Sequence, residues 1–74
     1  MSAREMFEEL GYKKEEYVNQ LIWKNNRQFI DFNKTSENLN IYMNGIRNWQ
    51  GFQVNDFKLL RAINKQIEEL GWND

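Results

Sequence analysis

The chain has 74 residues, of which 41% are hydrophobic and 15% aromatic, and it contains no cysteine, histidine or proline. This length predicts a single domain over residues 1–74 with a small hydrophobic core. Ten basic and eleven acidic residues give a net charge of −1, which excludes a polycation that coats nucleic acid by bulk charge. The missing residue types exclude Cys- or His-ligated zinc, thiol redox chemistry and imidazole catalysis.

Other sequence signals of catalysis are missing as well. The hydroxyl side chains have no histidine to activate them, and the four glycines are isolated rather than grouped in a phosphate-binding loop. The carboxylates of Glu8-Glu9 and Glu68-Glu69 are adjacent in sequence, so on a helix they point apart. We therefore expect no enzymatic activity, no cofactor and no metal.

The first ten residues carry three acidic side chains and no apolar run, which is unlike a secretory signal. The chain has no apolar stretch near the roughly 20 residues that a membrane helix needs. The absence of cysteine fits a reducing compartment. These features predict a cytoplasmic protein without a membrane partner.

A short helix is predicted at the N-terminus. Ser2 and Glu5 have the spacing of a capping box, and Gly11 fits the left-handed position that ends a helix. Tyr12 would then pack back on Phe7. The apolar residues fall at helical spacing, at Ala3, Met6, Phe7 and Leu10.

The middle of the chain changes to a period of two, which predicts strands at residues 17–24, 27–33 and 39–44. Asn25 and Asn26 separate the first two and suit a two-residue type I′ turn, because asparagine tolerates positive φ. Residues 34–38 form a polar loop before the third strand.

Residues 45–53 allow either a short fourth strand or an aromatic-rich loop. After them, Asn55 is a suitable N-cap for a long C-terminal helix, and Gly71 a suitable end, with Trp72 packing on Ile67. The expected apolar stripe comprises Phe57, Leu59, Leu60, Ile63, Ile67 and Leu70.

These elements predict an α+β fold in the order αβββα. An antiparallel meander of three strands, or four if residues 45–53 add one, would pack against the N- and C-terminal helices. On the third strand Leu39, Ile41 and Met43 share a face that we expect to be buried. On the second, Ile30 lies on the face opposite to Phe29.

More aromatic residues are present than one buried sheet face requires. One interpretation is that the extra rings merely cover a sheet edge. The other is a partner-binding surface, because exposed aromatics bounded by polar residues mark interaction sites. The candidate partner-binding residues are Trp23, Arg27, Phe29, Tyr42, Arg47 and Trp49.

Two further interpretations remain open for binding. Aromatics near Arg27 and Arg47 could stack single-stranded bases, although Asp31 and the acidic net charge disfavour this. An acidic strip could instead occupy a groove that normally holds nucleic acid, but a solvated helix face explains it more simply. The strip comprises Glu5, Glu8, Glu9, Glu15 and Glu16.

The two terminal segments, AREMFEELGY at residues 3–12 and AINKQIEELGW at residues 62–72, resemble those of small uncharacterised phage and prophage proteins of Gram-positive bacteria. The resemblance does not extend to the middle of the chain, where we expect partner choice to reside. It implies a stoichiometric binder of a host bacterial protein in the host cytoplasm, such as an inhibitor of antiviral defence of the anti-CRISPR type. The alternatives are a small nucleic-acid-binding or regulatory phage protein and a self-associating structural protein, with Tyr42 and Trp49 at a homodimer interface. A monomer and a homodimer are both compatible with the sequence.

Overall fold

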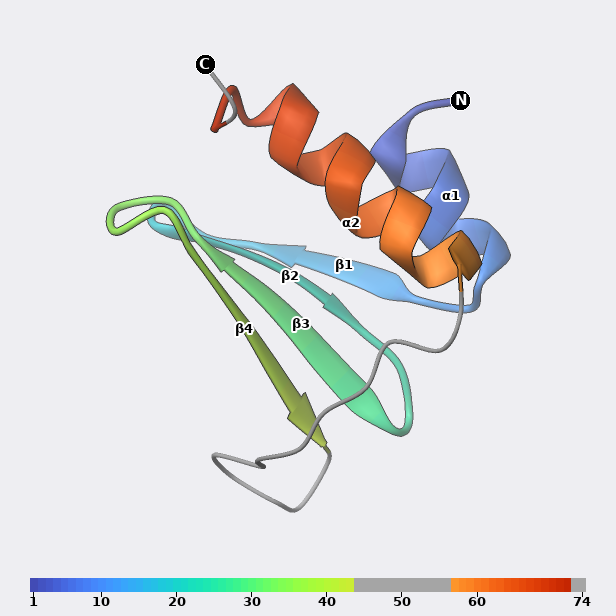
Figure 1. Cartoon of the computed structure of the whole chain (residues 1–74). Helices are drawn as coiled ribbons and strands as arrows, with labels where there is room; N and C mark the ends of the chain where they lie inside the picture. Colours follow the sequence, from blue (N-terminus) through green and yellow to red (C-terminus); the bar gives the residue numbers. More distant parts are fainter. Residues whose placement is uncertain (44–56, 73–74) are drawn as a thin grey trace. The chain divides into compact units, whose positions relative to one another are not determined.

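A computed structural model of the chain describes residues 1–43 and 57–72. It contains two helices and a four-stranded antiparallel sheet, in the α+β class that the sequence predicts (Figure 1). The chain divides into a helical unit and a sheet unit. In chain order the elements are α1 (Ala3–Glu9), β1 (Lys13–Glu16), β2 (Gln20–Lys24), β3 (Gln28–Asn33), β4 (Asn38–Met43) and α2 (Phe57–Glu69).

Both ends of α1 confirm the sequence prediction. The Ser2 hydroxyl accepts from the Glu5 amide at 3.1 Å, while the Glu5 carboxylate accepts from the Ser2 amide at 3.0 Å. Gly11 has a φ of 88°, and the Tyr12 amide donates to the Phe7 carbonyl at 3.0 Å. The rings of Phe7 and Tyr12 meet edge to face, with their centroids 5.7 Å apart. The helix is therefore closed by a Schellman motif with its hydrophobic contact.

The end of α2 repeats this motif. Gly71 has a φ of 76°, and the Trp72 amide donates to the Ile67 carbonyl at 3.1 Å. A Glu69 carboxylate oxygen accepts from the Ala3 amide at 2.9 Å, which satisfies one of the free donors at the start of α1. The end of α2 thus lies beside the start of α1. The expected N-cap, Asn55, lies outside the described residues.

The buried stripe of α2 differs from the prediction. Leu59, Ala62, Ile63 and Gln66 are buried, whereas Phe57 and Leu60 are 78% and 39% exposed. The buried positions follow the spacing i, i+3, i+4, i+7, so a single narrow face is covered. The prediction from apolar residues alone made this face too wide, and it did not include Gln66.

The sheet has the order β1-β2-β3-β4, so each strand pairs with its neighbour in sequence. The strand that the sequence did not predict is β1. All four of its residues are charged, so no apolar alternation marks it as a strand. β2 starts at Gln20, later than predicted, since Tyr17 belongs to the β1–β2 turn and donates its amide to the Gln20 carbonyl at 2.7 Å. The alternative fourth strand at 45–53 lies outside the described residues.

The turn between β2 and β3 is not of type I′. Type I′ needs positive φ at both central residues, and among the described non-glycine residues only Glu37 has a positive φ. Instead, the Asn25 side-chain oxygen accepts from the amides of Arg27 and Gln28, each at 2.8 Å. This Asx turn moves the central pair one residue along, to Asn26 and Arg27.

The register places four apolar residues of β2 and β3 on one face, here called the apolar face. Leu21 lies opposite Phe32 and Trp23 opposite Ile30, and all four are at most 4% exposed. Trp23 is 1% exposed, which corrects the expectation that it belongs to an exposed patch. Side chains of a strand point alternately to its two faces, so Trp23 lies on the face opposite to Gln20 and Lys24.

Truncating the buried indole should test this assignment. We expect Trp23→Ala to lower the free energy of unfolding by about 3–5 kcal/mol, because it removes a large buried side chain and leaves a cavity. Urea denaturation followed by circular dichroism measures the change, and Trp23→Phe should lose less. A loss below about 1 kcal/mol would contradict burial of this residue.

The end of α1 offers a test of backbone strain alone. A Cβ atom added at Gly11 meets nothing within 4 Å, so only the positive φ opposes a side chain. We expect Gly11→Ala to lower the free energy of unfolding by about 1 kcal/mol. Gly11→Asn should cost less, because asparagine tolerates the left-handed region. Equal losses in the two variants, measured by thermal unfolding, would contradict this explanation.

Candidate functional site

The sheet face opposite to Trp23 is the candidate binding surface, and we call it the outer face. Side chains alternate along each strand, and residues directly opposite in the register share a face. The outer face therefore carries its aromatic rings in one end row and only polar residues in the opposite end row. It comprises Lys13, Glu15, Gln20, Ile22, Lys24, Phe29, Asp31, Asn33, Asn38, Asn40 and Tyr42.

Two of the predicted binding residues lie side by side on this face. Phe29 on β3 is directly opposite Tyr42 on β4, and Phe29 is 36% exposed. Lys24 of β2 flanks the pair, with its ammonium 6.0 Å from the centre of the Phe29 ring. Lys13 of β1 continues the same row. The row thus combines two aromatic rings with two cations.

The other predicted residues divide into three groups. Arg27 is exposed in the turn next to this row, where the Asn25 side chain holds its backbone. Trp23 lies on the apolar face and does not join the row. Arg47 and Trp49 lie outside the described residues.

The next row contains a residue that the sequence prediction did not include. Asp31 is only 8% exposed, and it lies between Ile22 on β2 and Asn40 on β4. Its Oδ2 atom accepts from the Gln20 side-chain amide at 3.1 Å, whereas Oδ1 is buried without a hydrogen-bond partner. The sequence signal was an aspartate in the middle of the otherwise aromatic and aliphatic segment of β3.

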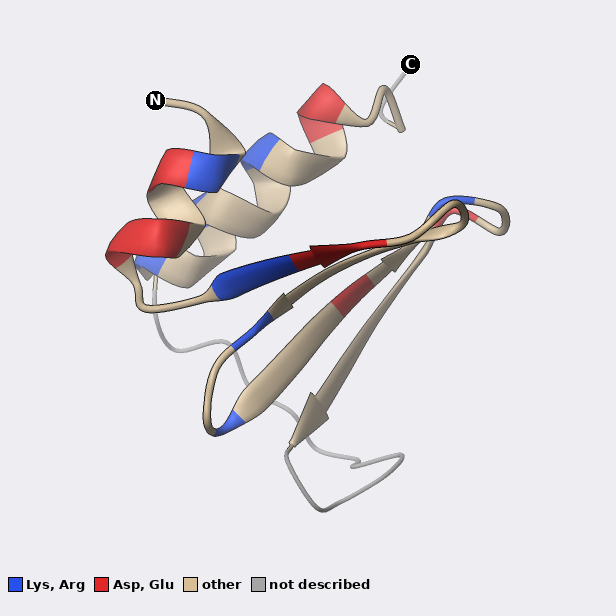
Figure 2. Cartoon of the chain, turned by 180° about the vertical axis from the view of Figure 1, so that it is seen from behind, with Lys and Arg blue, Asp and Glu red and all other residues tan. Residues whose placement is uncertain are grey.

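Charge is unevenly distributed over the sheet. Figure 2 shows charged segments along β1 and a single acidic segment within β3, and β4 carries no charged residue. Lys24 forms an ion pair with Glu15, and the Tyr17 hydroxyl donates to the same carboxylate at 3.0 Å. The cations of the outer face therefore lie on β1 and β2, and its two carboxylates are those of Glu15 on β1 and Asp31 on β3.

These contacts shift the titration of the β1 carboxylates. The Lys24 ammonium, followed by the Tyr17 hydroxyl, lowers the pKa of Glu15. Conversely, the Glu15 carboxylate raises the pKa of Tyr17. Lys34 and then Lys14 lower the pKa of Glu16 by hydrogen bonding to its carboxylate. The two contacts to Glu15 and the two to Glu16 therefore favour the charged form of both carboxyl groups.

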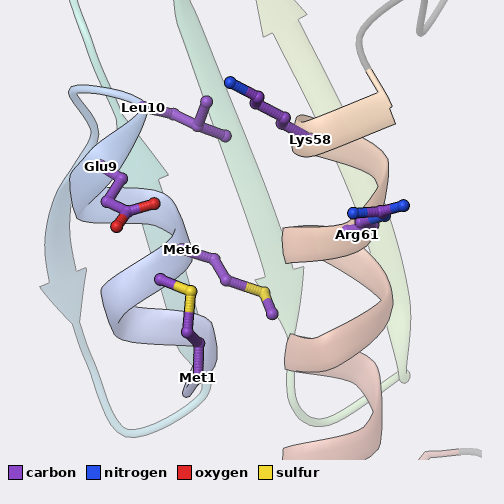
Figure 3. Close-up of a pocket in the computed structure, with 6 residues that line it drawn as sticks. All are labelled: Met1, Met6, Glu9, Leu10, Lys58 and Arg61. Atoms are coloured by element: carbon purple, nitrogen blue, oxygen red, sulfur yellow. The ribbon is translucent and has the colours of Figure 1, made fainter.

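The helical unit contains a pocket of about 210 Å³ between α1 and α2. In Figure 3 Met6 and Leu10 point from α1 towards α2, and the Lys58 side chain extends towards α1. Met1, Glu9 and Arg61 complete the lining. The pocket thus has apolar walls with both signs of charge around them, a mixture that selects no ligand class.

The described residues contain no group of three acidic side chains that could hold a metal ion. Within the same ranges, no helix is long and apolar enough to cross a membrane. Comparisons of the chain with protein-family models, with curated proteins and with solved structures found no match.

The ion pair between Glu15 on β1 and Lys24 on β2 predicts that the free energy of unfolding depends on pH. Because the pKa of Glu15 is lower in the folded chain than its ordinary value of 4.5, its stabilising contribution is complete above that value. The contribution is lost as the pH falls through the lowered pKa. We expect Lys24→Met to return the pKa of Glu15 towards the ordinary value, as measured by NMR titration of the carboxyl carbon. An unchanged pKa in this variant would contradict the assignment to Lys24.

Proposed function

We propose that the chain is a phage-encoded binding module that acts stoichiometrically on a host bacterial protein. The class of target is a protein of antiviral defence, such as a CRISPR effector. The outer face of the chain would be its contact surface. The observation that carries this proposal is the directly paired Phe29 and Tyr42 on the face opposite to the buried core. Aromatic side chains with few rotatable bonds are the usual anchors of protein interfaces. The phage origin and the class of target rest on the resemblance of the terminal segments.

Three features of the surroundings support a protein partner. Phe29 is partly exposed beside Arg27 and Lys24, which gives an apolar centre with a polar rim. The sheet below it is held by regular pairing along β2, β3 and β4, so the anchors need little ordering on binding. The outer face also carries charges of both signs, which suits recognition of a specific partner.

Binding of single-stranded nucleic acid is the second candidate. It is favoured by the row in which Lys13 and Lys24 adjoin Phe29 and Tyr42, since bases stack on aromatic rings next to cations. Against it, Lys24 is already paired with Glu15, and the Asp31 carboxylate lies in the adjacent row where it would repel phosphate.

The aromatic pair provides the test. We expect Tyr42→Ala to reduce capture of the partner from a lysate of the bacterial host at least about tenfold, as hot-spot residues do. The free energy of unfolding should fall by only about 1 kcal/mol, the upper range for a cross-strand pair. Quantitative mass spectrometry of the captured proteins measures the first effect, and urea denaturation measures the second.

Val18→Ala is the matched control, because Val18 is 98% exposed in the β1–β2 turn, away from the aromatic pair in the register. Capture should be unchanged in this variant and should survive nuclease treatment of the lysate. Partners that disappear after nuclease treatment would favour nucleic acid instead. Equal capture by the Tyr42→Ala variant and the natural chain would refute the outer face as the contact surface.

A further inference from the structure

The Asp31 carboxylate has an unsatisfied oxygen on the surface proposed for binding. Asp31 is 8% exposed, and Oδ1 has no hydrogen-bond partner, whereas Oδ2 accepts from Gln20 at 3.1 Å. A buried carboxylate oxygen that has lost water without gaining a donor destabilises the folded state. Such a group in a native chain calls for an explanation, and a donor supplied by a binding partner is one.

The neighbours of Asp31 on the outer face do not include a cation. Ile22 and Asn40 lie directly opposite it, and Phe29 and Asn33 lie two residues away along β3. The nearest cation in the register, Lys24, is held by Glu15. No described residue forms an ion pair with Asp31.

Four side chains of the outer face, two on β3 and two on β4, form a compact patch. Asp31 lies opposite Asn40, and in the next row of the same face Phe29 lies opposite Tyr42. Two aromatic rings therefore stand beside a carboxylate and an amide oxygen. We call these four residues the Asp31 patch.

We propose that the Asp31 patch binds an arginine side chain of the partner protein, an inference that rests on the proposed protein-binding function. A guanidinium is planar and weakly hydrated, so it can stack on an aromatic ring while its N–H groups donate to carboxylate and amide oxygens. Asp31 Oδ1 and the Asn40 side-chain oxygen are acceptors on one side of the rings. A lysine ammonium lacks the flat surface for stacking, and an anionic group is repelled by Asp31.

The members of the Asp31 patch differ in exposure. Asn40 and Tyr42 are half-buried, and Phe29 is the most exposed member of the patch. For a guanidinium to reach the buried Oδ1, side chains on the solvent side of the sheet would have to rotate, a motion that takes picoseconds to nanoseconds in exposed residues. The desolvated position then strengthens the contact, because few water molecules compete for the carboxylate.

Three short peptides test the inference on the full chain by NMR. The probes are acetyl-Gly-Arg-Gly-amide, its citrulline analogue, which is neutral but has nearly the same shape, and its lysine analogue. The arginine peptide should produce saturable amide shifts centred on the four residues of the Asp31 patch. Its affinity should exceed that of the citrulline and lysine peptides at least about fivefold, since charge-assisted and bidentate hydrogen bonds are the stronger ones.

Two substitutions that each remove one negative charge complete the test. Asp31→Asn should weaken arginine binding at least about fivefold, because it removes the charge at nearly constant shape. Glu37→Gln removes a negative charge from an exposed residue of the β3–β4 turn, outside the outer face, and should leave binding unchanged. Equal affinity of the three peptides, absence of shifts in the patch, or equal weakening by the two substitutions would overturn the inference.

The outcome is separable from that of the proposed function. If the natural chain and the Asp31→Asn variant capture the same host protein equally well, arginine recognition is refuted and the binding module stands. If the arginine peptide binds the patch but no host protein is captured, the proposed function fails and the ligand chemistry stands.

Discussion

The register between β2 and β3 determines which side chains of the sheet unit are buried. Leu21 opposite Phe32 and Trp23 opposite Ile30 place four apolar side chains on one face. Because alternation has a period of two, a shift of one residue would turn all of them to the other side. β1 and β4 pair with the outer edges of this hairpin and take their faces from it.

The same register places Asp31 in the middle of the outer face. Position 31 points away from the face that buries Ile30 and Phe32. A neutral residue at this position would therefore have left the apolar face unchanged. The retained carboxylate, with one oxygen unsatisfied, sits next to the Phe29–Tyr42 pair. The Asp31 carboxylate, which stabilises neither the core nor the turns, therefore lies on the surface that we propose for partner binding.

Local signals explain what could be predicted from the sequence. The Ser2 capping box and the glycine ends of both helices depend on contacts within a few residues, and the structure confirms them. The separation of Phe29 and Tyr42 from the apolar face follows from alternation alone. Their direct pairing does not, because it depends on the lengths of the turn and of the adjoining strand.

The sequence by itself determined the two helix ends, the α+β class and the alternation of the strands, since these follow from backbone preferences and periodicity. The tertiary structure alone decided that charged Lys13–Glu16 forms a strand, because the edge of β2 supplies its hydrogen-bond partners and the Lys24–Glu15 ion pair. It also decided that Trp23 is buried and that Asp31 lies beside the aromatic pair. Burial and cross-strand neighbours depend on residues distant in sequence, and no local pattern encodes them.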